Sequence, residues 1–164
     1  MDSQEFLAAY DEYADALFRH CYYRVSDREI AKDLVQETFV RTWKYVADGG
    51  KVKNVRAFLY RVAHNLIVDI WKKKKSVSFD ELAEKGFDPK DERVGSDLER
   101  MMIAKDALRL LDMLEESYRE IIVMRYIDDL SPREIAKIMG VSENTVSVRI
   151  HRALKKIREL LEHE

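Results

Sequence analysis

The side chains best suited to binding chemistry form a polar and basic row near the end of the chain. Short polar residues come first and basic residues follow at helical spacing: Ser142, Asn144, Thr145, Ser147, Arg149, His151, Arg152 and Lys155. Short polar groups near the start of a helix suit base edges, and Arg and Lys further along suit phosphates. The row predicts a helix that enters the major groove of DNA. The alternative interpretation is a helical hairpin with a solvated basic face.

The residues before this row carry the signals of a helix and a turn. Ser131 precedes Pro132, and a glutamate follows three residues after the serine, as in a capping box with proline at the first helical position. Gly140 suits the turn, because glycine adopts positive φ without steric cost. Ser142 is a natural N-cap for the next helix. Residues 130–157 therefore predict a helix-turn-helix.

Patterns typical of enzymes and metal sites are missing from the sequence. The four histidines, His20, His64, His151 and His163, lie at no metal-ligand spacing, and there is no glycine-rich phosphate loop. The single cysteine, Cys21, has apolar and aromatic neighbours and cannot form an intrachain disulfide. We therefore expect no enzymatic activity, no cofactor and no metal, and a chain that works in the reducing cytoplasm.

Composition favours an almost wholly helical chain. Of 164 residues, 37% are charged, and the two prolines and five glycines are too few for the many turns of an all-β fold. No basic start leads into an apolar run, and no apolar stretch is long enough to span a bilayer, so we expect neither secretion nor membrane insertion. The net charge is only −2, yet basic residues cluster within 51–75 and again in the last helix. Two separate basic patches in an acidic chain indicate two separate DNA contacts.

Helical periodicity and breakers divide the chain into two small helical domains. Helices are predicted over 3–24, 27–46, 54–75 and 98–115, followed by a helix opened by a capping box at Ser117 and closed by Asp128 and Asp129, and then by the helix-turn-helix. The first domain covers 1–75 and the second covers 98–164. Residues 76–97, which are acidic and contain glycine and proline, predict a flexible, mostly extended linker.

Two helices of the first domain have an outer face with binding chemistry. In 27–46, Leu34, Val35, Phe39, Trp43 and Val46 form the apolar side, and Asp33, Gln36, Glu37, Val40 and Lys44 form the other. That second side is either solvated or docks a protein. In 54–75, the inward residues are Val55, Phe58, Leu59, Val62, Leu66 and Ile70. The outward residues are Arg61, His64, Val68, Trp71, Lys72 and Lys75, with Tyr60 beside them and Asn65 and Asp69 at the boundary. Such a row can stack on bases and pair with phosphates, unless the linker covers Trp71.

Three segments in this order resemble the extracytoplasmic-function (ECF) sigma factors of the sigma-70 family. Residues 33–43 (DLVQETFVRTW) are similar to the segment that docks on core RNA polymerase. Residues 58–75 (FLYRVAHNLIVDIWKKKK) are similar to the promoter-melting and minus-ten segment. Residues 118–131 and the helix-turn-helix are similar to the domain that reads the minus-thirty-five element. Domain 1–75 then corresponds to sigma region 2 and domain 98–164 to region 4.

The resemblance implies a function and a role for each surface. The chain would bind core RNA polymerase and direct promoter-specific transcription initiation without catalysing a reaction. Core polymerase would contact Asp33, Gln36, Glu37 and Val40; the minus-ten contact would use Tyr60, Arg61, His64, Asn65, Trp71, Lys72 and Lys73; the row in 142–155 would read the minus-thirty-five element. The 48–53 loop would lie where the family holds a flipped base. Promoter DNA is the second partner, and the resemblance admits an anti-sigma factor as a third.

One departure from the family concerns the recognition helix. Ser147 and Val148 stand where the family often has a basic residue followed by serine, so a common contact is missing there. The competing hypothesis is a stand-alone helix-turn-helix transcriptional regulator. It accounts for 98–164, predicts a dimer, and leaves the two faces of the first domain without a role.

Overall fold

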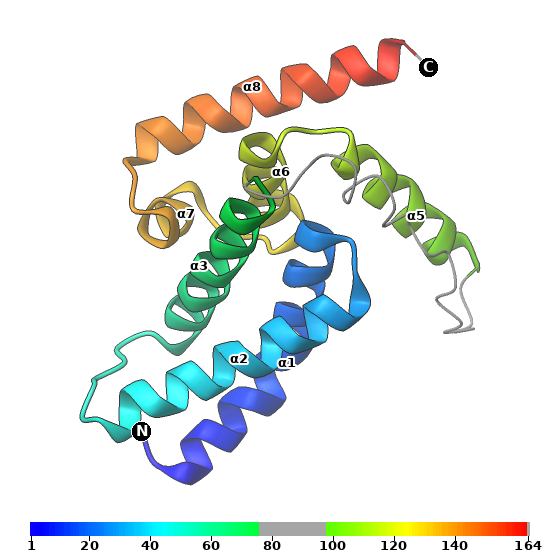
Figure 1. Cartoon of the computed structure of the whole chain (residues 1–164). Coiled ribbons are helices and arrows are strands. Elements are labelled where there is room, and N and C mark those ends of the chain that lie inside the picture. The colour runs from blue at the N-terminus through cyan, green and yellow to red at the C-terminus, as the bar shows by residue number, and fades with distance from the viewer. Residues whose placement is uncertain (76–97, 164) are drawn as a thin grey trace.

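The computed structural model describes residues 1–75 and 98–163 (Figure 1). Its elements are α1 (Ser3–Val25), α2 (Arg28–Ala47), α3 (Val55–Lys75), α5 (Leu98–Asp112), α6 (Glu116–Ile122), the π-helical segment η1 (Val123–Ile127), α7 (Pro132–Met139) and α8 (Glu143–Glu162). All regular structure within the described ranges is helical, which confirms the predicted all-α class. The acidic linker predicted over 76–97 lies outside the described residues.

The N-terminal half (residues 1–75) packs α1, α2 and α3 around one apolar centre. The Asp2 carboxylate accepts a hydrogen bond from the Glu5 amide at 2.8 Å and so caps α1. The Asp27 carboxylate caps α2 in the same way, accepting from the Ile30 amide at 3.0 Å. Each cap satisfies an amide that has no partner within its helix. The three helices bury Leu17, Ala31, Leu34, Phe39, Leu59, Ala63 and Ile67.

The predicted helix-turn-helix is confirmed in α7 and α8. Ser131 Oγ accepts from the Glu134 amide at 3.2 Å, and Ser142 Oγ accepts from the Thr145 amide at 3.1 Å. Gly140 ends α7 with φ of 70°, the left-handed conformation expected of the turn. The capping box at Ser131 is only half formed, because the Glu134 carboxylate lies 3.5 Å from Arg56 of α3 instead.

The second predicted capping box, at Ser117, is wrong. Helix α6 begins at Glu116, its N-cap is Glu115, and no side chain hydrogen-bonds at that cap. The reason is the tight turn that leaves α5, where the Leu114 amide donates to the Leu111 carbonyl and the Leu114 side chain is buried. The N-cap of α6 therefore lies at Glu115, two residues before the serine.

Trp43, which was predicted on the apolar side of its helix, is exposed, and so is Leu161 near the end of α8. Trp43 is 39% exposed on α2, and Leu161 is 54% exposed on α8. The last turns of α8, to which Leu161 belongs, extend beyond α6 (Figure 1). A hydrophobic pattern with a period of 3.6 residues identifies the apolar face of a helix. It does not show how far the neighbouring helices extend along that face.

A π-helical segment, η1, links α6 to the helix-turn-helix. The Asp128 amide donates to the Val123 carbonyl and the Leu130 amide to the Met124 carbonyl, a wider spacing than in an α-helix. Val123 and Met124 are fully buried, and the chain leaves the segment through Asp129 at φ of 53°. The sequence predicted that Asp128 and Asp129 end the helix. It did not predict the π-helical geometry, which inserts one residue and changes the direction of Asp128.

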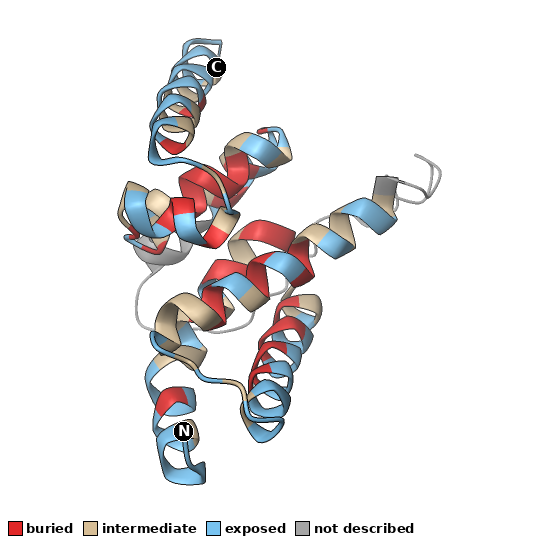
Figure 2. Ribbon diagram, turned by 90° about the vertical axis from the view of Figure 1, so that its left-hand side faces the viewer, coloured by how far each residue is buried: buried red, intermediate tan, exposed pale blue. Residues whose placement is uncertain are grey.

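The C-terminal half (residues 98–163) packs directly on the N-terminal half. α7 lies against α3, and η1 lies against α1. Buried residues are red in Figure 2, and the apolar ones form a single cluster that includes residues of both halves. The two predicted domains are therefore in contact in this structure.

Gly140 provides a stability test of the turn. A Cβ atom at this position would meet no atom within 4 Å, so a substitution is opposed only by the positive φ. We expect Gly140→Ala to lower the free energy of unfolding by about 1–2 kcal/mol, as measured by urea unfolding. Gly140→Asn is the matched control and should lose less, since asparagine tolerates this conformation. Equal losses for the two variants would contradict this account.

Candidate nucleic-acid interface

The predicted DNA-reading row of α8 lies on its outer face. Ser142, Asn144, Ser147, His151, Arg152 and Lys155 are exposed, and Thr145 and Arg149 are partly buried. The opposite face packs through Val146 and Ala153, which are fully buried. The Arg149 guanidinium lies 3.9 Å from the Glu120 carboxylate of α6. The helix thus offers short polar groups at its start and cations further along, as base edges and phosphates require.

The fold exposes some residues of the predicted minus-ten row on α3 and buries others. Arg61, Asn65, Lys72 and Lys73 are exposed. Trp71 is half-buried, and the Lys74 ammonium lies 5.2 Å from the centre of its ring, in cation–π geometry. The exposed part of the row is therefore cationic and polar, and the indole is partly covered.

Tyr60 and His64 were predicted to face outward, and this orientation is wrong. Tyr60 is 2% exposed and His64 is 7% exposed. The Tyr60 ring meets the edge of the His20 ring at 5.2 Å, and the Arg24 guanidinium lies 3.4 Å from His64 Nδ1. The physical reason is that α3 packs against α1, α2 and α7, and α1 contacts Tyr60 and His64, so the buried face of α3 is wider than the apolar stripe predicted from spacing.

Burial keeps both side chains neutral near pH 7. Removal from water, together with the neighbouring Arg24 and His20, lowers the pKa of His64 from 6.5 to about 3. Burial, with the Asp128 carboxylate, raises the pKa of Tyr60 to about 12. In this arrangement neither residue can contribute charge to a phosphate contact.

The predicted polymerase-docking face of α2 is exposed and has an apolar edge. Asp33, Gln36, Glu37 and Val40 all face solvent, Val40 being 50% exposed. Trp43, beside them, packs at 4.9 Å on the Phe6 ring of α1. The carboxylates of this face repel DNA. The exposed valine and tryptophan beside them favour a protein partner. The sequence analysis had placed Trp43 in the core and so missed this edge.

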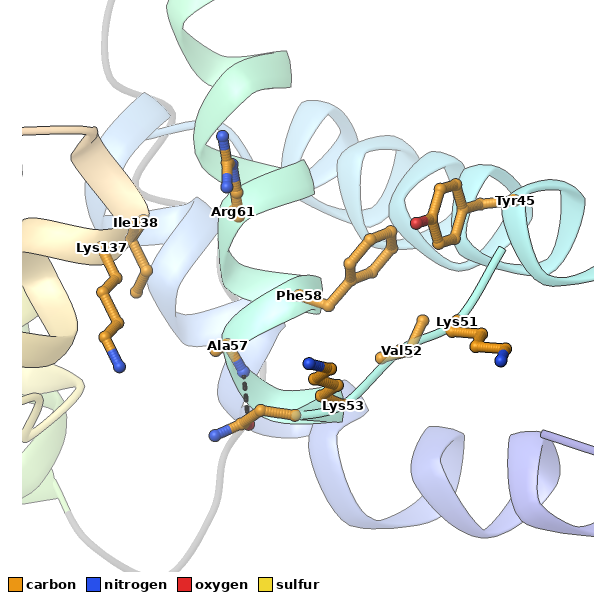
Figure 3. Close-up of a pocket in the computed structure, with 10 residues that line it drawn as sticks. Tyr45, Lys51, Val52, Lys53, Ala57, Phe58, Arg61, Lys137 and Ile138 are labelled. Carbon is orange, nitrogen blue, oxygen red and sulfur yellow. Dashed lines mark hydrogen bonds between the residues drawn. The ribbon is translucent and has the colours of Figure 1, made fainter. Parts of the chain in front are cut away.

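A pocket of about 530 Å³ opens between α2, the 51–54 loop, α3 and α7 (Figure 3). The Tyr45 and Phe58 rings pack at 4.9 Å on one side of it. Four cations and four uncharged residues complete the lining: Lys51, Lys53, Arg61 and Lys137, and Val52, Asn54, Ala57 and Ile138. Gly50 adjoins Tyr45, and a Cβ atom there would overlap the tyrosine ring. Aromatic faces beside cations can bind a base and its phosphate.

The pocket lies where the sequence predicted a base-holding loop, but three of its residues were missed. Phe58 had been assigned to the core, although it lines the pocket, and Tyr45 had no assigned role. Lys137 comes from α7, far along the chain, and no local pattern connects it with the loop.

A set of charged side chains, here called the charged interface, joins the two halves. It consists of His20 and Arg24 from α1 and Asp112, Glu116, Arg119, Glu120 and Asp128 from the C-terminal half. His20 Nδ1 lies 2.5 Å from Asp128 Oδ2, both side chains being almost fully buried. The Arg24 guanidinium, 0% exposed, donates to Glu116 Oε1 at 2.5 Å and to Glu120 Oε2 at 3.4 Å.

Arg119 makes the second part of the charged interface. Its guanidinium donates to the Tyr23 carbonyl at 2.7 Å, to Ser26 Oγ at 2.6 Å and to Asp112 Oδ1 at 2.7 Å. A cation at the last carbonyls of α1 is favoured by the helix dipole. Burial lowers the pKa of Arg119, opposed by Asp112 and Glu116. None of this network was predicted, because its partners are far apart in the sequence.

Comparison with known families matches both halves separately. Residues 9–77 match the family described as Sigma-70 region 2, and residues 104–157 match Sigma-70, region 4. None of the described helices is long and apolar enough to cross a membrane.

Curated relatives cover nearly the whole chain. The ECF RNA polymerase sigma factor SigW of Bacillus subtilis is 30% identical over 98% of this chain and 90% of its own length. The ECF RNA polymerase sigma factor SigL of Mycobacterium tuberculosis is 32% identical over 94% and 88%. This chain therefore belongs to the ECF RNA polymerase sigma factors of the sigma-70 family.

Solved structures show the same fold. A structure of CnrH in complex with the cytosolic domain of CnrY matches with a TM-score of 0.74 and 25% identity, covering 99% of this chain and 91% of that one. The sigma factor RpoE of Bartonella quintana, in complex with the anti-sigma factor NepR, matches with a TM-score of 0.73 and 24% identity, covering 97% and 98%.

The pKa of His64 predicts an acid sensitivity. Between pH 6.5 and about 3 the unfolded chain binds a proton that folded His64 does not, so its contribution to stability is full above pH 6.5 and is lost as the pH falls. Relative to His64→Gln, the free energy of unfolding of the native chain should fall by about 1.4 kcal/mol per pH unit below 6.5. Urea unfolding from pH 7 to 4.5 measures this difference.

The His64→Gln variant provides the control for the other ionisable groups. The charged side chains around His64 are present in both proteins, so their contributions cancel in the difference. Parallel pH profiles for the two proteins would show that His64 titrates normally in the folded state.

Proposed function

We propose that this sigma factor reads the minus-thirty-five promoter element with α8. The observation that carries the proposal is the exposed row from Ser142 to Lys155, which lies opposite a buried face. Asn144 and Ser147 stand near the helix start and suit base edges, while Arg152 and Lys155 follow at phosphate-contacting distance along the helix. Arg149 and His151 complete the surface.

The minus-ten element is proposed to bind α3 and the adjoining pocket. Arg61, Asn65, Lys72 and Lys73 are exposed and provide phosphate and polar contacts, with Trp71 beside them. The cationic pocket at the 48–53 loop is proposed to receive a base from the melted strand.

Core RNA polymerase is proposed to bind the α2 face formed by Asp33, Gln36, Glu37 and Val40. The domains would be 1–75 and 98–164, with the linker running through polymerase between them. The chain would act without catalysing a reaction, in the cytoplasm with the polymerase. The RpoE structure contains an anti-sigma factor, and a protein of that class is a candidate partner for this chain as well.

The stand-alone regulator hypothesis is the weaker of the two. It uses only the helix-turn-helix and gives no role to residues 9–77, which match Sigma-70 region 2. It also requires dimerisation for specificity, whereas two DNA contacts on one chain provide it without a second copy.

Run-off transcription tests the proposal directly. Core polymerase and a pool of random promoter fragments are incubated with and without the protein. Protein-dependent transcripts from defined starts support it, and their shared upstream sequences give both elements. No transcripts, together with no co-migration with core polymerase, would favour the regulator.

Arg152 tests the minus-thirty-five contact. Arg152→Ala should weaken promoter binding by holoenzyme and reduce the slope of log affinity against log salt by about 1, because one phosphate contact is lost. Filter binding at several salt concentrations measures both. Lys32→Ala, an exposed cation on α2 outside the proposed DNA surfaces, is the control. An equal effect of the two substitutions would remove Arg152 from the DNA surface.

Asp33 tests the polymerase face. Asp33→Lys should weaken binding to core polymerase by about tenfold or more, since it places a cation where a carboxylate is expected to meet the partner. Fluorescence titration of labelled protein with core enzyme measures the affinity. Asp15→Lys makes the same charge change at an exposed position of α1. If both reversals leave affinity unchanged, polymerase binds elsewhere.

A further inference from the structure

We propose that Val148 selects thymine in the minus-thirty-five element by packing on the C5-methyl group of that base. The inference rests on the proposed function, in which α8 enters the major groove. It gives a role to a residue that the proposed function leaves without one, and it names the base that this position of the helix reads.

Val148 lies in the middle of the DNA-reading row of α8. Asn144 stands one turn before it, and His151 and Arg152 stand one turn after it, at spacings that place all four side chains on one face of the helix. The three neighbours are exposed, and Val148 is itself 39% exposed. A base pair that lies between Asn144 and Arg152 therefore meets the valine side chain.

Neither burial nor helix propensity accounts for a valine at this position. Ile150, Leu154 and Ile157 of the same helix pack against the apolar core, whereas Val148, on the outer face, is exposed. Valine also forms helices less readily than unbranched residues, because a β-branched side chain has few allowed rotamers in a helix. The side chain is thus an apolar group on a surface of polar and basic groups.

The major groove offers one apolar group to such a side chain, the C5-methyl of thymine. The other base edges present hydrogen-bond donors and acceptors, among them the amino group of cytosine. The two methyl groups of valine cannot donate or accept a hydrogen bond, so covering one of those edges would leave it unsatisfied. Covering a thymine methyl instead removes apolar surface from water, which is favourable. Val148 therefore favours thymine by attraction and disfavours cytosine by desolvation.

Val148→Ser is the variant that removes this preference with the least effect on the helix. Serine and valine have similar helix propensities, and position 148 is not in the core. The serine hydroxyl can donate to a base edge or accept from it, so serine pairs with more than one base. The variant thus loses both methyl groups and gains no preference for thymine.

Replacement of single thymines by deoxyuridine tests the contact. Deoxyuridine pairs with adenine as thymine does and lacks only the C5-methyl group. On a promoter obtained from the run-off pool, each thymine of the upstream element is replaced in turn on both strands, and holoenzyme affinity is measured by filter binding. One replacement should weaken binding by the native holoenzyme about fourfold, the factor expected for one buried methyl group. The same replacement should leave binding by the Val148→Ser holoenzyme unchanged.

Two matched variants and the salt dependence separate this contact from a structural effect. Val148→Thr keeps one methyl group and should keep the sensitivity to deoxyuridine. Leu161→Ser also replaces an exposed apolar residue of α8, outside the row, and should keep the sensitivity too. Val148→Ser should leave the slope of log affinity against log salt unchanged, because no charge is lost. A lower slope would mean that phosphate contacts have moved and would contradict the assignment.

Three results would overturn the inference: an upstream element without thymine, no deoxyuridine position that weakens native binding, or an equal loss in the native and Val148→Ser proteins. Failure of the proposed function is distinguishable from these results. If α8 does not read the element, holoenzyme affinity is insensitive to Arg152→Ala as well as to deoxyuridine. If only the inference fails, Arg152→Ala still weakens binding.

Discussion

The need to neutralise a buried arginine governs how this molecule is arranged. Arg24 is fully buried in α1, and a guanidinium removed from water requires carboxylates at close range. α6 provides them, and this fixes α6 across the end of α1. Arg119 of the same helix then reaches the last carbonyls of α1, so each half provides a cation to the other. The π-helical segment follows at once and aims Asp128 at His20.

This arrangement gives α3 two buried sides and thereby divides its functional surface. Tyr60 lies against His20 and His64 lies beside Arg24, both on α1, while α7 packs against the same helix. The exposed part of the row is Arg61, Asn65, Lys72 and Lys73, and burial holds His64 neutral. Buried ion pairs add little net stability compared with apolar packing, but they specify one partner and one orientation. Their role here is accordingly to select the relative placement of the two halves.

Local signals in the sequence were enough for the elements and for the family, but not for what lies between the halves. Ser131, Gly140 and Ser142 act within a few residues of themselves, so capping and turn chemistry predicted the helix-turn-helix. Tyr60 and His64 were misplaced because their covering comes from helices distant in sequence. Ser117 failed as a cap for a local reason, since the turn at the buried Leu114 sets the start of α6. The polar rows of α2 and α8 were predicted to face outward and mostly do, because solvent, not a partner helix, defines them.

Gly50 leaves room for the Tyr45 ring because glycine has no side chain beyond a hydrogen atom. Its backbone amide donates to the Tyr45 carbonyl, and the missing side chain lets the tyrosine ring lie flat over the loop and against Phe58. The restriction at position 50 is one of space and not of backbone angle. Among sequences that share this loop, positions 45 and 50 should consequently vary together: an aromatic residue at 45 requires glycine at 50, and a side chain becomes acceptable at 50 only where residue 45 is small.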